Sequence, residues 1–72
     1  MAYEAHKRGL YSLSNTQIEK YIKDNPDAKD LDYAHLLSAV NYLHLDDIDK
    51  GIEELTLIRR LFPDSEFTKE VL

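Results

Sequence analysis

The chain has 72 residues, a formal net charge of −5 and no cysteine. A domain of this size has little core. The absence of cysteine excludes disulfide scaffolds and thiolate zinc sites, and the acidic balance disfavours nucleic acid as a partner because phosphate binding needs surplus cations. No apolar run approaches the roughly 20 residues that cross a bilayer, so we expect no direct membrane insertion by this segment.

The first half of the chain predicts two short helices. The first is expected over residues 2–8, where Gly9 is well placed to end it. Ser14 to Gln17 has the pattern of a capping box and predicts a second helix over residues 15–24. This helix must end before Pro26, because the residue before a proline is kept out of the helical region.

The second half predicts two longer helices, over residues 31–44 and 48–61. Asp30 precedes the first of them, and an aspartate in the short turn at residues 46–47 precedes the second, each as an N-cap. The helix over 48–61 carries an apolar stripe with the spacing of one helix face, formed by Ile48, Ile52, Leu55, Ile58 and Phe62. After Pro63, Asp64 or Ser65 is expected to cap a fifth helix over residues 66–72.

Two similar segments, each built around a proline, indicate an internal repeat. They are residues 25–28 and 62–65, and their prolines lie 37 residues apart. A repeat of this length is typical of stacked supersecondary units. We predict an all-α fold of stacked antiparallel helical hairpins. The first repeat would span residues 1–27 and lack the start of its first helix. The second would span residues 28–63, with residues 64–72 forming the first helix of a next repeat or a capping helix.

The whole chain resembles the tetratricopeptide repeat family, whose pattern is Trp-x2-Leu-Gly-x2-Tyr, then Ala-x3-Phe, then Pro. The second unit has Tyr42 and Pro63 at the matching positions. Conservative residues stand at three others, Ala39, Gly51 and Leu55, while His35 and Ser38 depart from the apolar consensus. The resemblance implies a non-catalytic scaffold that binds a protein or peptide segment.

A narrower resemblance concerns the BamD-type outer-membrane assembly lipoproteins of Gram-negative bacteria. The segments that carry it are Asp32-Tyr33-Ala34, which opens the second repeat, and residues 62–67, which close it. This resemblance implies an internal fragment of a lipoprotein at the periplasmic face of the outer membrane. Its partners would be other subunits of the assembly machine or unfolded barrel substrates.

No set of residues has the spacing of a catalytic, cofactor or metal site. His35 and His44 are nine residues apart, which places them on opposite sides of one helix. The acidic residues 46–49 do not form a calcium loop, because the sixth and twelfth positions counted from Asp47 are Ile52 and Ile58. We therefore expect no enzyme activity, no cofactor and no metal.

A partner groove is implied by the family resemblance, in which the first helix of each unit lines a concave face. On the helix over 31–44 a separate apolar stripe is formed by Tyr33, Leu36, Val40 and Leu43, with Lys7 as a charge at the rim. The alternative, that this stripe packs as core against the first two helices, stays open. A self-associating repeat fragment with an exposed stacking face is the other candidate function, and it would form homo-oligomers. A membrane-surface module is disfavoured because the chain is acidic and has no basic amphipathic helix.

Overall fold

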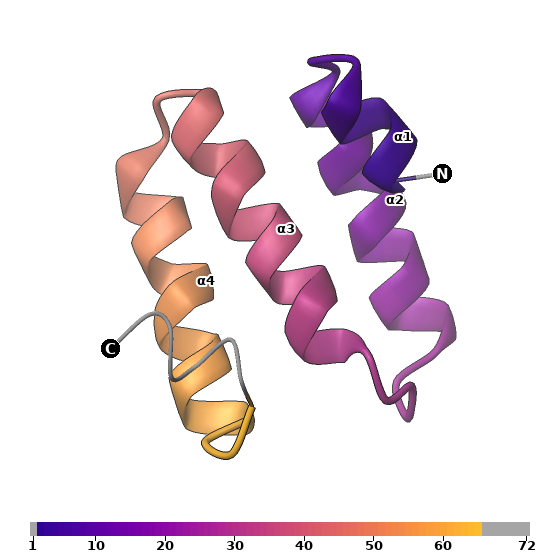
Figure 1. Cartoon of the computed structure of the whole chain (residues 1–72), viewed down its shortest axis with the longest axis vertical. Coiled ribbons are helices and arrows are strands. Elements are labelled where there is room, and N and C mark those ends of the chain that lie inside the picture. The colour runs from indigo at the N-terminus through magenta and orange to yellow at the C-terminus, as the bar shows by residue number, and fades with distance from the viewer. Residues whose placement is uncertain (1, 66–72) are drawn as a thin grey trace.

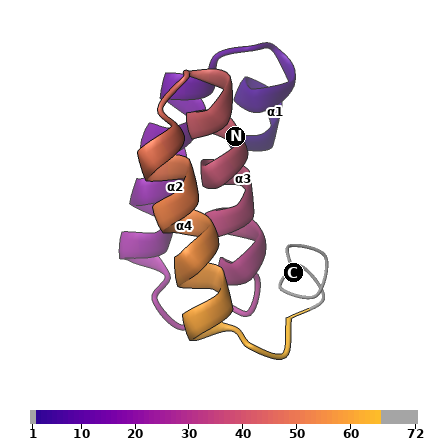
Figure 2. The same cartoon turned by 90° about the vertical axis from the view of Figure 1, so that its left-hand side faces the viewer.

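The computed structural model describes residues 2–65, and every structural statement below concerns that part of the chain. It contains four helices: α1 (Ala2–Lys7), α2 (Tyr11–Asp24), α3 (Leu31–His44) and α4 (Ile48–Leu61). Each helix packs on the next one in the chain (Figure 1). Figure 2 shows α1 and α3 on one side of this stack and α2 and α4 on the other. No strand occurs in the described range, and the predicted all-α hairpin arrangement is confirmed.

The second hairpin has the predicted bounds at both helices. Asp47 caps α4 as expected, because its carboxylate accepts a hydrogen bond from the backbone N–H of Lys50 at 3.4 Å. Asp30 makes no such bond at the start of α3. Its Oδ1 instead accepts a hydrogen bond of 2.6 Å from the hydroxyl of Tyr21. The fifth helix expected over residues 66–72 lies outside the described residues.

The predicted start of α2 is wrong, and so is the capping box. The helix begins at Tyr11 after Leu10, which offers no side-chain cap. Ser14 lies inside the helix and is fully buried. Its hydroxyl donates to the backbone oxygen of Ala2 at 2.8 Å. Gly9, with φ +78°, reverses the chain so that α2 starts directly beside α1, and Ser14 is therefore used between helices.

The two hairpins have the same backbone geometry at a spacing of 37 residues. Both ends of α2 and of α4 differ by this number. The residues that precede the two helices have similar dihedral angles, φ −90° and ψ 66° at Leu10 and φ −95° and ψ 73° at Asp47. Those that follow agree more closely, with φ −133° and ψ 60° at Asn25 and φ −132° and ψ 63° at Phe62. The offset between the two prolines is therefore also present in the backbone.

The turns inside the two hairpins show the same offset of 37 residues. Gly9 and Asp46 are 37 residues apart, and they are the two residues with positive φ in the described range, at 78° and 61°. Aspartate tolerates the left-handed region better than most residues do, so it can take the place of a glycine here. Because α1 ends at Lys7 and α3 at His44, these first helices also end in register.

Two different interfaces hold α3. Toward α2, Ala34 and Leu37 form a buried cluster with Ile18, and Tyr21 and Ile22 pack against it. Toward α4, Gly51 lies so close that an added Cβ would be 2.9 Å from Leu43 Cδ2. The remaining face of α3 is left for the candidate site.

Candidate functional site

The apolar stripe predicted to line a groove lies on the less buried side of α3. Tyr33 and Leu43 are 37% and 40% exposed, and Leu36 and Val40 are half-buried. The residues of α3 that are buried belong to its other faces: Leu31, Ala34, Leu37, Ser38, Ala39 and Asn41. The stripe is therefore accessible in part along its whole length.

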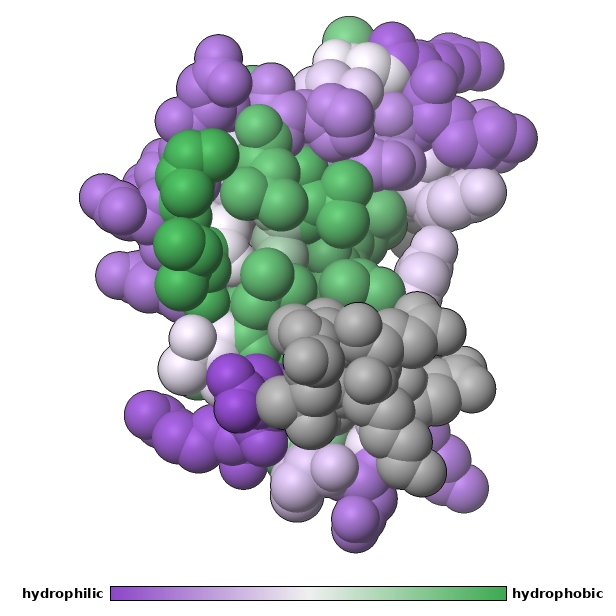
Figure 3. Space-filling view, turned by 60° about the vertical axis from the view of Figure 1, so that its left-hand side comes forward, coloured by the Kyte–Doolittle hydropathy of each residue, from purple (hydrophilic) through white to green (hydrophobic). Residues whose placement is uncertain are grey.

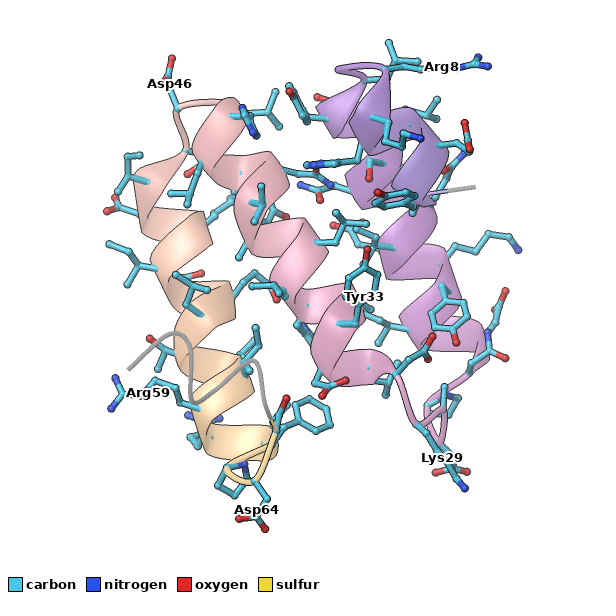
Figure 4. The ribbon with its side chains drawn as sticks, in the orientation of Figure 1. Arg8, Lys29, Tyr33, Asp46, Arg59 and Asp64 are labelled. Carbon is cyan, nitrogen blue, oxygen red and sulfur yellow. The ribbon has the colours of Figure 1, made fainter. Side chains whose placement is uncertain are left out.

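The two ends of this stripe lie in different surroundings. Tyr33 extends from α3 toward α1 and α2 (Figure 4), where it lines a pocket together with Ala2 and Tyr3. Leu43 lies against Gly51 of α4. Lys7, predicted as a rim charge, is exposed on α1, and its Nζ lies 5.6 Å from the centroid of the Tyr3 ring.

Next to Leu43, α4 exposes two large apolar side chains. Ile48 is 50% exposed and Ile52 is 54% exposed, while Leu55 on the same face is half-buried. Figure 3, in which the α4 side of the molecule comes forward, shows hydrophobic side chains gathered in one area. We call this surface the α3–α4 apolar face and define it by Leu36, Val40, Leu43, Ile48, Ile52 and Leu55.

The corresponding face of α2 is covered by α3. The residues 37 positions before Ile48, Ile52 and Leu55 are Tyr11, Asn15 and Ile18. All three contact α3: Tyr11 stacks on the His44 ring with centroids 4.3 Å apart, Asn15 Oδ1 accepts a hydrogen bond of 2.9 Å from Asn41 Nδ2, and Ile18 packs in the buried cluster. The offset between the two prolines therefore also relates the residues of these two helix faces.

A buried hydrogen-bond network fixes α3 to the first hairpin. Asn41 is fully buried, and its Nδ2 donates to Ser14 Oγ at 2.8 Å as well as to Asn15. His6 Nδ1 lies 2.6 Å from Asn41 Oδ1, which can only accept, so this ring nitrogen carries the proton. Since three helices contribute to the network, it determines the register of α3 on α1 and α2.

Each of the three histidine rings contacts side chains of other helices. His35 Nδ1 donates to Glu54 Oε2 at 2.6 Å, and the His35 ring lies 6.2 Å from that of Phe62. The rings of His6 and His44 are 6.0 Å apart, next to Tyr11. Between residues 2 and 65, no three histidine or acidic side chains gather in a geometry that would hold a metal ion.

Two tyrosines have a raised pKa. The hydrogen bond to Asp30 raises the pKa of Tyr21, with smaller contributions from partial desolvation and from the negative charge of that carboxylate. Burial raises the pKa of Tyr42, and the charges of Glu19, Glu54 and Asp47 add to the effect. Both phenols therefore stay protonated at neutral pH and are not candidate bases.

Within the described residues, none of the helices has the length and apolar character needed to cross a membrane. Comparison of the chain with models of protein families, with curated proteins and with solved structures found no match.

Proposed function

We propose that this chain is a non-catalytic protein-interaction scaffold of the tetratricopeptide type, which binds an amphipathic helix of a partner on the α3–α4 apolar face. The partner helix would lie against Leu43, Ile48, Ile52 and Leu55. A helix in a hydrophobic groove is a common mode of peptide recognition, in which apolar anchors supply affinity and charged rims supply orientation.

One observation carries this proposal: the face of α4 that is exposed matches, at an offset of 37 residues, the face of α2 that binds α3. On α2 this face holds a helix through Tyr11, Asn15 and Ile18. On α4 the counterparts are more apolar and two of them are at least half exposed. A surface with the same backbone geometry and more exposed apolar area is suited to the same kind of occupant.

The family part of the proposal rests on the residues and on the hairpin geometry together. Ala39 is fully buried and Gly51 lies against Leu43, which is the role that small residues have between paired helices in tetratricopeptide repeats. We extend the proposal to the outer-membrane assembly lipoproteins on the strength of Asp32-Tyr33-Ala34 and Phe62-Pro63. In that case the chain acts at the periplasmic face of the outer membrane, and its partners are envelope proteins.

The test is a selection of helical peptides from a displayed library on the wild-type chain, followed by affinity measurements on two variants. Ile52→Glu places a charge in the proposed site. Leu61→Glu is the matched control, because Leu61 is 53% exposed against 54% for Ile52. The two residues lie nine positions apart on α4, so they point in opposite directions.

We expect the selected peptides to lose at least tenfold in affinity on Ile52→Glu and to keep it on Leu61→Glu, since burying an unpaired charge costs more than about 1.4 kcal/mol. The double variant Leu36→Ser/Val40→Ser should also weaken binding while helicity survives. Equal loss on Ile52→Glu and Leu61→Glu, or none on either, would contradict the proposed site.

Self-association is the second candidate, and the exposure of Ile48 and Ile52 favours it. If a second copy covers the face, light scattering over a concentration series will show a dimer that Ile52→Glu abolishes. A strict monomer at the highest concentration would contradict self-association.

A further inference from the structure

Three aromatic rings from three helices meet where α1, α2 and α3 come together. The Tyr11 ring of α2 and the His44 ring of α3 are stacked, with an interplanar angle of 1° and centroids 4.3 Å apart. The centroid of the His6 ring on α1 lies 5.5 Å from that of Tyr11 and 6.0 Å from that of His44. Because these two distances are nearly equal, His6 lies beside the stacked pair, and Tyr11 does not separate the two imidazoles.

The separation of the two imidazoles suits a shared metal ion. A ring nitrogen binds zinc at about 2.1 Å, which places the ion about 3.2 Å from the centroid of the ring. Two rings on one ion therefore have centroids about 5.2 Å apart at a tetrahedral angle and about 6.4 Å apart when the ion lies on the line between them. The observed 6.0 Å falls inside this range.

The hydrogen bond to Asn41 prepares His6 as a ligand. His6 Nδ1 donates to Asn41 Oδ1 at 2.6 Å, so the lone pair of the neutral ring is on Nε2. Histidines that bind metals almost always donate their other N–H to an oxygen in this way, which fixes the tautomer and the orientation of the ring. Asn41 is itself fully buried and bonded to Ser14 and Asn15, so the support behind His6 is rigid.

His44 supplies the second imidazole from the solvent side. It is exposed and is the last residue of α3, whereas His6 is half-buried. Stacking on Tyr11 limits the orientations of the His44 ring. An ion can therefore reach the pair from solvent.

We propose that His6 and His44 form a site for a divalent transition-metal ion and that the bound ion links α1 to α3. Imidazole is a suitable ligand for zinc, copper and nickel. Among the described residues no third histidine or acidic side chain completes a metal-binding group, so water fills the remaining positions. The spacing of histidines along one helix could not reveal this pair, because its members lie on different helices. The inference goes beyond the proposed function, since it needs neither the α3–α4 apolar face nor a partner protein.

The test is a titration of the full chain with zinc chloride at neutral pH, followed by nuclear magnetic resonance at the three histidine rings. We expect saturable shifts at His6 and His44. We expect none at His35, whose Nδ1 is bonded to Glu54 on another side of the fold.

Substitutions of the histidines by glutamine separate the pair from the third ring. His44→Gln and His6→Gln each leave one imidazole, and each should lower the affinity for zinc by about tenfold or more. The glutamine at position 6 keeps an N–H donor for Asn41. His35→Gln is the matched control and should bind zinc as the wild type does. Far-ultraviolet circular dichroism checks that each variant is folded.

Stability gives a second readout. Zinc should raise the urea midpoint of the wild type and of His35→Gln, because an ion that binds only the assembled pair stabilises the folded chain. It should leave the midpoint of His44→Gln nearly unchanged.

Absence of saturable shifts at His6 and His44 would overturn the proposal and show that the three rings only pack together. Equal zinc affinity of the wild type, His44→Gln and His6→Gln would overturn it as well. Ile52→Glu, which disrupts the α3–α4 apolar face, should leave the zinc titration unchanged. Failure of the metal site can therefore be told from failure of the proposed function.

Discussion

The two interfaces of α3 are built differently. Toward the first hairpin, α3 is held by a buried polar network in which Asn41 bonds to Ser14, Asn15 and His6. Toward α4 it is held by close approach, with Leu43 against the bare backbone of Gly51, and by the part-buried hydrogen bond from His35 to Glu54. Hydrogen-bond networks specify register, whereas small residues allow two helices to approach closely. One helix can thus join two units of a repeat by different means.

This difference between the two interfaces also accounts for the exposed α3–α4 apolar face. On α4 the counterpart of Asn15 is Ile52, so the next position in the stack offers apolar area in place of polar bonding. A polar network accepts few partners, since each bond must be matched, while an apolar face tolerates variety. We infer that the first interface is used to fix the fold and the α3–α4 apolar face to bind other helices.

The largest effect is expected at Asn41. Asn41→Ala removes two donated hydrogen bonds and leaves Asn15 Oδ1 and the His6 N–H without their partner in a buried site. We expect the free energy of unfolding to fall by about 3 kcal/mol, measured by urea denaturation. Asn25→Ala is the control, because the Asn25 side chain donates to a backbone oxygen in an exposed place. A loss below about 1 kcal/mol would show that the network does not hold α3.

Substitutions at Gly51 test the interface between α3 and α4. Gly51→Val places branched carbons where even a Cβ would lie 2.9 Å from Leu43 Cδ2 and 3.4 Å from the backbone oxygen of Ala39. We expect a loss of about 2 kcal/mol through overpacking. Gly51→Ala should be nearly neutral, since about 1 kcal/mol of helix propensity offsets the displacement of a half-exposed leucine. The double variant Gly51→Ala/Leu43→Ala should then be more stable than Leu43→Ala alone. A less stable double variant would contradict close packing of Gly51 against Leu43.

Glu54→Gln makes the second hairpin resemble the first at one position. The hydrogen bond from His35 to Glu54 becomes neutral, and the partly exposed pair should lose about 1 kcal/mol of stability. Thermal unfolding at pH 7 measures this loss. The counterpart change Gln17→Glu should alter stability far less, because no described residue donates a hydrogen bond to Gln17 Oε1. Equal effects at both positions would show that the hydrogen bond from His35 does not distinguish Glu54 from Gln17.

The smallest effect concerns alkaline pH. The folded state holds the phenol proton of Tyr42 more tightly than the unfolded chain does, where the pKa is 10.0. Below pH 10 this contribution to stability is therefore fully present, and it is lost as the pH rises from 10 through the folded pKa. Between pH 9 and 11, the urea midpoint of Tyr42→Phe should decline less steeply than that of the wild type. Parallel curves would show that Tyr42 does not contribute.

The bounds of α3 and α4 could be predicted from sequence because local signals mark them. Asp47 caps α4 and Pro63 follows its end. The start of α2 could not be predicted, because Leu10 gives no local signal of a helix start. Ser14 has the sequence pattern of a cap, but its hydroxyl bonds to the backbone oxygen of Ala2 on another helix.

The candidate site was predicted only in part, for a related reason. The spacing of Tyr33, Leu36, Val40 and Leu43 defined the stripe but left open whether it was core or groove. Its division between a pocket at Tyr33 and a groove at Leu43 depends on where α1 and α4 lie. Likewise the unpaired Gln17 Oε1 is visible only when the neighbouring helices are in place.

The most direct test of the central claim is a crystal structure of the chain with a helical peptide selected on its α3–α4 apolar face. We predict that the peptide lies on α4 as α3 lies on α2, so that shifting the chain by 37 residues superposes α3 on the peptide. A peptide bound in extended form, or on the Leu61 side of α4, would contradict the account.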